Sequence, residues 1–243
     1  MQHTITFKPD GTFKTASIDW NQVEAAIFRD GFARLPDMLD ATGCRALASL
    51  YGEDRLFRSR IDMARHAFGR GTYAYFAAPL PEPITALRTA LYAGLSPIAN
   101  RMMRALGRDA TYPATHAEFI ARCHAAGQTR PTPLLLQYRT GDYNRLHQDL
   151  YGDTVFPLQS VTMLSRPNED FTGGEFLLVE NRPRQQSIGR VLAPLQGEMI
   201  VFAVSDRPVQ AARGFMRATM RHGVSEVLSG ERYTFGCILH DAA

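Results

Sequence analysis

The sequence predicts a mainly β protein with α-helices, in which a barrel or jelly-roll core is buttressed on one side by N-terminal helices. Two observations predict this architecture. Apolar residues recur at helical spacing before about residue 132, and short β-rich runs separated by turns follow from residue 133. No repeat or linker separates the two parts. We therefore expect residues 1–243 to form a single domain, with a mostly helical part at 1–132 and a β-core at 133–243.

Composition limits the class of protein. The 243 residues are 45% hydrophobic, enough for one large core, and the formal net charge of +3 is compatible with a polyanionic partner without requiring one. No apolar run approaches the roughly 18 residues of a membrane span, and the N-terminus lacks the basic and apolar segments of an export signal, so a cytoplasmic protein is expected. Neither a disulfide framework nor a zinc cluster is expected from three distant cysteines, Cys44, Cys123 and Cys237.

Four helices are expected, because apolar residues recur every three or four positions between capping and breaking residues. The longest contains Pro97, which should kink or split it. The expected helices lie between Asp19 and Gly31, between Asp40 and Gly52, from Ile84 to Leu106, and around Phe119 to Cys123 with an end near Gly127.

Six strands are expected after the prolines Pro131 and Pro133, which end any helical continuation. Each run is short and rich in β-branched or aromatic residues. Several short strands joined by turns are typical of a barrel or a jelly roll. The expected strands are Leu134 to Tyr138, Leu158 to Leu164, Glu175 to Val179, Met199 to Val204, Thr219 to Val227 and Tyr233 to Leu239.

One short motif in this β-rich part has the chemistry of a metal site. In an extended His147-Gln148-Asp149, the imidazole and the carboxylate would lie on the same face of the strand. Fe(II) in oxygenases takes two histidines and one carboxylate on one face of its octahedron, which leaves three positions free. The candidate third ligand is His222, inside an expected strand.

A joint pattern extends this motif: His147-x-Asp149, the distal His222, and Arg232 ten residues later, across an expected turn at residues 229–231. The pattern resembles the 2-oxoglutarate/Fe(II)-dependent oxygenase superfamily, in its prolyl-hydroxylase-like branch, over roughly residues 134–239. The resemblance implies a double-stranded β-helix core, which is a cupin-like jelly roll. It also implies Fe(II) held by His147, Asp149 and His222, with 2-oxoglutarate and O₂ as co-substrates and succinate and CO₂ as products.

The same resemblance implies a site for the co-substrate. Arg232 would bind the far carboxylate of 2-oxoglutarate, and a guanidinium suits that role because it donates a charge-assisted fork of hydrogen bonds. Tyr138, nine residues before His147, and Thr234, two residues after Arg232, match positions that help to hold 2-oxoglutarate in this superfamily. The segment around Gly173-Gly174 matches a hairpin of the family's scaffold.

Three further motifs resemble a narrower prokaryotic oxygenase family that is proposed to act on alkylated nucleic acid bases. They are residues 71–76 (Gly-Thr-Tyr-Ala-Tyr-Phe), 128–133 (Gln-Thr-Arg-Pro-Thr-Pro) and 146–153 (Leu-His-Gln-Asp-Leu-Tyr-Gly-Asp). This resemblance implies oxidative demethylation of a base as the reaction. A basic stretch beside aromatics could grip phosphates and stack a base: Arg58, Arg60, Arg65 and Arg70 before Tyr73, Tyr75 and Phe76.

Two alternatives stay open at this point. The ten-residue spacing of His222 and Arg232 favours hydroxylation of a protein side chain or a small molecule. A cupin-like metal-binding domain without turnover is the second alternative. The presence of all three metal ligands together with Arg232, which would clamp 2-oxoglutarate, argues against it. The other histidines are expected to be structural or exposed: His3, His66, His116, His124 and His240.

Overall fold

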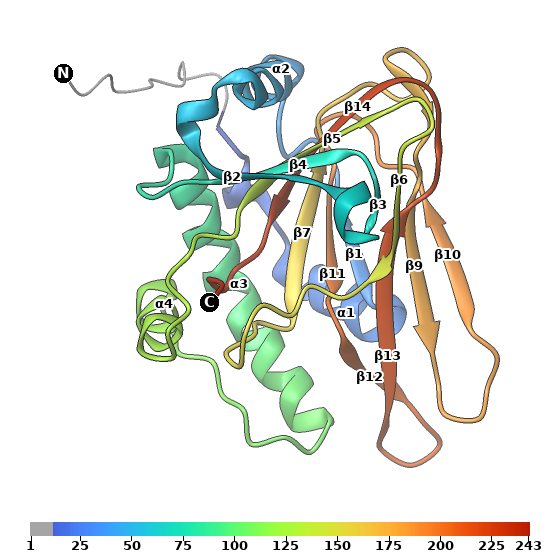
Figure 1. The fold of residues 1–243 in the computed structure, drawn as a ribbon. Helices are drawn as coiled ribbons and strands as arrows, with labels where there is room; N and C mark the ends of the chain where they lie inside the picture. The colour runs from blue at the N-terminus through green and yellow to red at the C-terminus, as the bar shows by residue number, and fades with distance from the viewer. Residues whose placement is uncertain (1–11) are drawn as a thin grey trace.

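The structure is a computed structural model, and it describes residues 12–243. Two antiparallel sheets face each other, with the long helices beside the larger sheet and the smaller sheet on the far side (Figure 1). His3 and Lys8 lie outside the described residues.

All four expected helices are present, and local capping explains where they start and stop. The Asp19 carboxylate accepts hydrogen bonds from the first turn of α1, and Gly31 ends that helix in the left-handed conformation. Asp40 caps α2, and Thr115 caps α4 in a capping box with Glu118. The helices are α1 (Trp20–Asp30), α2 (Ala41–Ser49), α3 (Glu82–Ala105) and α4 (His116–Ala125). Short 3-10 turns include η4 (Met63–His66).

The split expected at Pro97 is absent, because α3 continues through this residue as one helix. Proline removes one backbone hydrogen bond and disfavours helix, so another interaction must hold the two halves in line. Buried apolar residues lie on both sides of the proline, with Leu91 and Leu95 before it and Ile98 and Met102 after it. Because both halves pack into the same core, tertiary burial outweighs the local cost.

The larger sheet contains strands from both parts of the chain. Its order is β1-β11-β7-β14-β5-β4-β2, and β8 pairs with β14. The N-terminal part of the chain therefore supplies strands to the sheet that the C-terminal part builds. The strands are β1 (Phe32–Leu35), β2 (Phe57–Asp62), β4 (Thr72–Phe76), β5 (Leu134–Arg139), β7 (Leu158–Met163), β8 (Phe171–Gly173), β11 (Met199–Ala203) and β14 (Val227–Cys237).

The smaller sheet has the order β10-β9-β13-β6-β3, and β12 pairs with β13. It contains β3 (Gly69–Arg70), β6 (Tyr143–His147), β9 (Phe176–Asn181), β10 (Ile188–Leu192), β12 (Asp206–Gln210) and β13 (Phe215–Val224). All six expected strands are therefore present within the two sheets. The turn expected at residues 229–231 is absent, because β14 runs through this segment with Gly230 at a φ of 79°.

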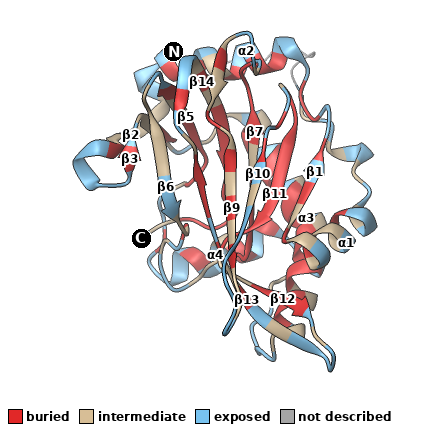
Figure 2. Cartoon of the chain, turned by 90° about the vertical axis from the view of Figure 1, so that its right-hand side faces the viewer, coloured by how far each residue is buried: buried red, intermediate tan, exposed pale blue. Residues whose placement is uncertain are grey.

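Buried apolar residues fill the space between the helices and the larger sheet, and β11 is buried along its whole length (Figure 2). The three cysteines are free and buried. Among the described helices, none combines the length and the apolar character that crossing a membrane requires.

Two buried histidines should make the free energy of unfolding depend on pH. Burial, followed by the charge of Arg88, lowers the pKa of His116 and of His240 to about 4. The unfolded chain, with histidine pKa values near 6.5, therefore binds protons between about pH 6.5 and 4 that the folded chain does not. We expect the free energy of unfolding to fall as pH drops through this window, by roughly 3 kcal/mol for each histidine. Chemical denaturation at several pH values measures this loss.

The double variant His116→Gln with His240→Asn provides the control, because neither replacement titrates in this window. Its unfolding free energy should depend much less on pH between 6.5 and 4.5 than that of the unmodified protein. An equally steep fall in the double variant would assign the pH dependence to other groups.

Candidate active site

The three candidate metal ligands meet between the two sheets. His147 ends β6 and pairs with His222 of β13, and Asp149 follows two residues after β6. The Nε2 atom of His147 lies 3.5 Å from Oδ1 of Asp149, and Nε2 of His222 lies 3.3 Å from Oδ2. One ligand atom from each residue lies within 4.8 Å of the other two. This arrangement presents two imidazoles and one carboxylate to a common point.

Neighbouring side chains hold these ligands in a form that can bind a metal. The Tyr151 hydroxyl donates to Oδ1 of Asp149 over 2.6 Å, and the Gln159 amide donates to Oδ2 over 2.7 Å. Nδ1 of His147 lies 2.7 Å from the carbonyl of Arg145, so this nitrogen is the donor in the neutral ring and Nε2 keeps its lone pair toward Asp149.

The protonation states also suit metal binding. Burial, followed by the charge of His222, lowers the pKa of His147, which favours the neutral ring. Burial alone would raise the pKa of Asp149, but the hydrogen bond and charge of His222, the charge of His147 and the Tyr151 hydroxyl together hold it below its ordinary value. Metal ligands must be deprotonated, and this environment delivers a carboxylate with a neutral imidazole beside it.

The predicted co-substrate residues lie on the inner face of the larger sheet. Arg232 of β14 pairs with Tyr138 of β5, and its guanidinium carbon lies 5.4 Å from the centre of the tyrosine ring. Arg232 is only 1% exposed, and burial lowers its pKa to about 10. Within residues 12–243, its Nε and Nη1 atoms and the Tyr138 hydroxyl have no hydrogen-bond partner. A buried cation without a counter-charge is costly, so this position suits an anion.

One cavity of about 370 Å³ joins the two groups of residues. His147, Asp149 and His222 line it together with Tyr138, Arg232 and Thr234, so the fold brings all six predicted residues together. The cavity therefore suits a dianion that chelates a metal at one end and accepts hydrogen bonds from the Arg232 guanidinium at the other. The donor set and the unpaired guanidinium therefore fit Fe(II) and 2-oxoglutarate.

Sequence reasoning missed two residues of this site. Gln159 lies in β7 beside two further polar residues, Ser160 and Thr162, so no local signal in the sequence marks it. Tyr151 lies in the quoted motif at 146–153, but only the fold shows that its hydroxyl reaches Asp149.

The loop that carries Asp149 and Tyr151 is anchored from outside the cavity. The Gln128 amide bonds both the N–H and the carbonyl of Thr154, as well as the carbonyl of Asp241. Gly152 lies so close to Gln128 that a Cβ atom there would come within 2.5 Å of its side chain. The motif at 128–133 therefore holds the loop next to the metal site in place through Gln128.

Two solved structures of other proteins share this fold. A prolyl-4-hydroxylase of Pseudomonas putida matches with a TM-score of 0.54 at 15% identity, over 89% of this chain and 96% of that one. An oxidoreductase of the 2OG-Fe(II) oxygenase family from Burkholderia pseudomallei matches with a TM-score of 0.54 at 18% identity, over 93% and 94% of the two chains. The predicted jelly roll is confirmed as the fold that this chain shares with both structures.

The chain belongs to one particular oxygenase family. Residues 71–242 match the family described as oxygenase, catalysing oxidative methylation of damaged DNA. An uncharacterized protein of Mycobacterium tuberculosis (strain CDC 1551 / Oshkosh) is 52% identical over 177 residues, which cover 73% of this chain and 76% of the relative. An uncharacterized protein of strain H37Rv matches with the same values. The resemblance stated from the motifs is confirmed, and the alternative of a cupin-like domain without turnover is set aside.

Proposed function

We propose that this oxygenase binds Fe(II) through His147, Asp149 and His222, and that it oxidises an alkyl group on a nucleic acid base. One observation carries the metal assignment: three ligand atoms within 4.8 Å share a cavity with a buried, unpaired guanidinium. Two histidines and one carboxylate leave open positions on iron for a co-substrate and O₂.

When bound, iron and 2-oxoglutarate supply the oxidant for a substrate C–H bond, with release of succinate and CO₂. The chain's own contribution is orientation. Tyr151 and Gln159 fix both oxygens of Asp149, and the Arg145 carbonyl fixes the tautomer of His147. No protein group has to act as a general base in this assignment.

We assign the far carboxylate of 2-oxoglutarate to Arg232, with Tyr138 and Thr234 beside it. The free donors of the guanidinium and of the Tyr138 hydroxyl support this assignment, because each needs an acceptor when buried. Thr234 is 2% exposed and lines the same cavity from the strand that carries Arg232.

Gly174 gives this clamp a sharp test. A Cβ atom at this position would lie 2.8 Å from Cδ of Arg232 and 3.4 Å from its Nε. We therefore expect Gly174→Ala to displace the guanidinium and to raise the 2-oxoglutarate concentration needed for half-maximal turnover about tenfold, equivalent to ~1.4 kcal/mol. Succinate formation against 2-oxoglutarate concentration measures this shift.

Gly214→Ala is the matched control for Gly174→Ala. Gly214 has a φ of 66°, close to the 62° of Gly174, but nothing lies within 4 Å of its Cβ position. Both variants carry the backbone strain of the left-handed region, and only one crowds Arg232. Equal 2-oxoglutarate requirements in the two variants would contradict the clamp role.

The remaining residues that line the cavity favour a substrate with a flat, uncharged group. Beyond the metal and co-substrate residues, the lining includes aromatic and aliphatic side chains, Tyr73, Tyr75, Leu134, Leu136 and Ile238, together with the polar Asn144, Gln148 and Ser160. Tyrosine rings stack on planar rings, and a nucleobase presents such a ring together with an alkyl group to be oxidised. Oxidation of an N-methyl group gives a hemiaminal that loses formaldehyde. The family description, which names damaged DNA, supports the same substrate class.

The direct test is succinate formation by anaerobically Fe(II)-loaded protein that receives 2-oxoglutarate and O₂. Methylated single-stranded DNA, methylated RNA and no prime substrate are compared. Succinate stimulated by a methylated strand, with formaldehyde released in step, is the expected result. Turnover that no nucleic acid stimulates would contradict the base substrate and favour hydroxylation of a protein side chain or small molecule, which the apolar wall at Leu134, Leu136 and Ile238 would also accept.

A further inference from the structure

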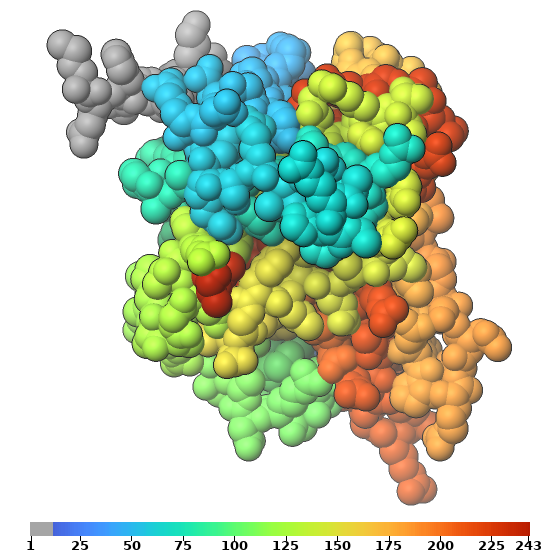
Figure 3. Space-filling model, in the orientation of Figure 1, coloured from blue at the N-terminus to red at the C-terminus, as the bar shows by residue number. Residues whose placement is uncertain are grey.

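The cavity that holds the buried site reaches the surface beside β3 and β6. At its inner end Asp149 and His222 are 8% and 6% exposed, whereas Phe68 and Leu146, which line the same cavity, are 49% and 42% exposed. In Figure 3 the segment of η4 and β3 adjoins the segment that follows β6 on the face toward the viewer. Large apolar side chains thus remain in water at the entrance.

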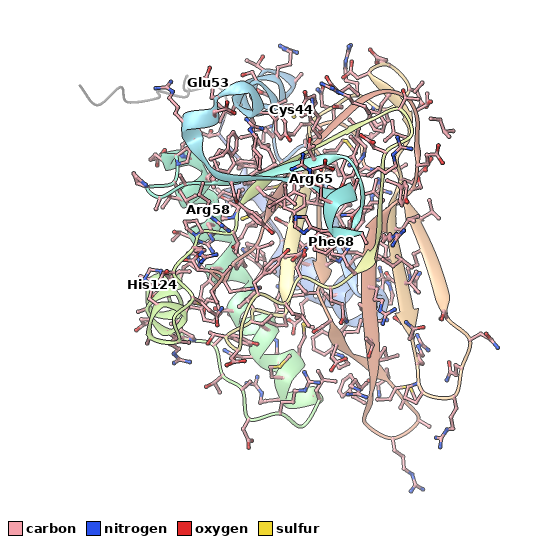
Figure 4. All side chains as sticks on the ribbon, in the orientation of Figure 1. Cys44, Glu53, Arg58, Arg65, Phe68 and His124 are labelled. Carbon is pink, nitrogen blue, oxygen red and sulfur yellow. The ribbon has the colours of Figure 1, made fainter. Side chains whose placement is uncertain are left out.

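Arginines accompany these apolar side chains. Arg145 lines the cavity next to Leu146, and Arg70 lies on β3, which pairs with β6. Within the described part of the chain, neither forms an ion pair with a carboxylate; one Arg145 nitrogen donates to the Ala67 carbonyl. Arg65, labelled with Phe68 on the η4–β3 segment in Figure 4, is 81% exposed, and its nearest acid is Asp62 at 3.4 Å.

Two arginines of the basic stretch identified in the sequence are not available for a ligand. The guanidinium of Arg58 lies 4.5 Å above the Tyr75 ring and donates to the Pro131 carbonyl. Arg60 pairs with Asp54 and packs over the Tyr51 ring. Because local partners already hold these two, the hypothesis that this basic stretch could grip phosphates rests on Arg65 and Arg70.

We propose that single-stranded nucleic acid binds a surface at the cavity entrance, here called the rim, which consists of the lining residues Phe68, Arg145 and Leu146 with Arg65 and Arg70 on the adjoining η4–β3 segment. Arg70 and Arg145 would contact phosphates, and the exposed Phe68 would stack on a base next to the one that enters the cavity. This inference rests on the nucleic acid substrate proposed above. It adds two points: which surface binds the nucleic acid, and that the nucleic acid is single-stranded.

Physical reasons favour this partner over a duplex or an acidic peptide. The ligand atoms are buried, so a base must leave its stack to reach them, and a single strand requires no base pair to be broken. Unpaired arginines beside an exposed aromatic ring match the combination that binds single strands, in which charge follows the backbone and rings stack on bases. An acidic peptide would use the arginines but would leave Phe68 and Leu146 in water.

The test measures binding of a fluorescent, singly methylated oligodeoxynucleotide by anisotropy at several salt concentrations, with the full chain. We expect the unmodified protein to bind the single strand at least about tenfold more tightly than the matching duplex or a polyglutamate peptide of equal charge. Arg70→Gln and Arg145→Gln should each weaken binding and reduce the slope of log K against log salt by about 0.7, which is one phosphate contact. Phe68→Ala should weaken binding about tenfold at an unchanged slope.

Matched controls lie outside the rim. Arg184→Gln removes an exposed arginine in the turn between β9 and β10, and Leu195→Ala removes an apolar side chain that is 67% exposed. Both should bind the strand as the unmodified protein does. Equal affinities in rim variants and controls would overturn the proposal, and so would duplex or polyglutamate binding as tight as that of the single strand.

Parallel assays keep this proposal separate from the proposed function. Strand binding that depends on the rim, without succinate formation stimulated by the methylated strand, would support the rim and contradict base oxidation. Succinate formation from 2-oxoglutarate by a protein that binds no strand would overturn the rim while leaving the iron and 2-oxoglutarate assignments intact.

Discussion

Alanine at His147 or Asp149 is expected to abolish both succinate formation and Fe(II) binding. Each substitution removes one of three ligands whose donor atoms lie within 4.8 Å of one another. The carboxylate also accepts hydrogen bonds from Tyr151 and Gln159, which its loss would leave unsatisfied. Anaerobic titration with Fe(II) measures binding directly, and succinate formation measures turnover.

Two nearby substitutions control for this experiment. His66→Ala and Asp153→Ala remove the same side-chain types from exposed positions, and both variants should bind iron and turn over normally. A thermal melt of each variant establishes that it is folded. Undiminished turnover in His147→Ala or Asp149→Ala would overturn the metal assignment.

The second large effect is expected at Arg232, where Arg232→Met should weaken 2-oxoglutarate binding without lowering the stability of the fold. The loss of two charge-assisted hydrogen bonds, worth about 3 kcal/mol together, should raise the 2-oxoglutarate requirement about 100-fold. Without ligand, however, Arg232 is a buried cation with unpartnered nitrogens, so its replacement by an apolar side chain should not lower the melting temperature. Addition of 2-oxoglutarate should stabilise the unmodified protein and not the variant.

Arg88→Met is the matched control for this second prediction. Arg88 is equally buried, but it pairs with Asp241 and also donates to the carbonyls of Ile238 and His240. Its removal leaves a buried carboxylate without its cation, which should cost about 3–5 kcal/mol of stability. A melting temperature that falls as far in Arg232→Met as in Arg88→Met would contradict the claim that Arg232 has no counter-charge until an anionic ligand binds.

Local patterns in the sequence predicted the helices because capping is local. Asp19, Gly31 and Asp40 act within one turn of the residues they cap, so their effect is visible in a short window of sequence. Several strands outside the six expected runs were not predicted, and β1 and β4 are two of them. Short apolar runs do not distinguish strand from helix until a partner strand is known, and the partners of these two are β11 and β5.

The site shows the same division. The order and spacing of His147, Asp149, His222 and Arg232 could be interpreted from the sequence because iron and a carboxylate restrict which side chains can bind them. Their roles stay predictions until iron and 2-oxoglutarate binding are measured. The support from Gln159 could not be predicted, because its bond to Asp149 joins β7 to the loop after β6 through a contact that no spacing encodes.

The sequence by itself thus determined the class of chemistry, the candidate ligands and the ends of the helices, since each depends on residue type and local spacing. Only the tertiary structure decided which polar groups remain without partners. Arg58 and Arg60 are satisfied by neighbours, whereas two nitrogens of the buried Arg232 find no hydrogen-bond partner among residues 12–243 in the cavity that the metal ligands also line. That difference arises from strand pairing and packing between distant segments, and it is the reason why we propose Arg232, and not the other two, as a binding group.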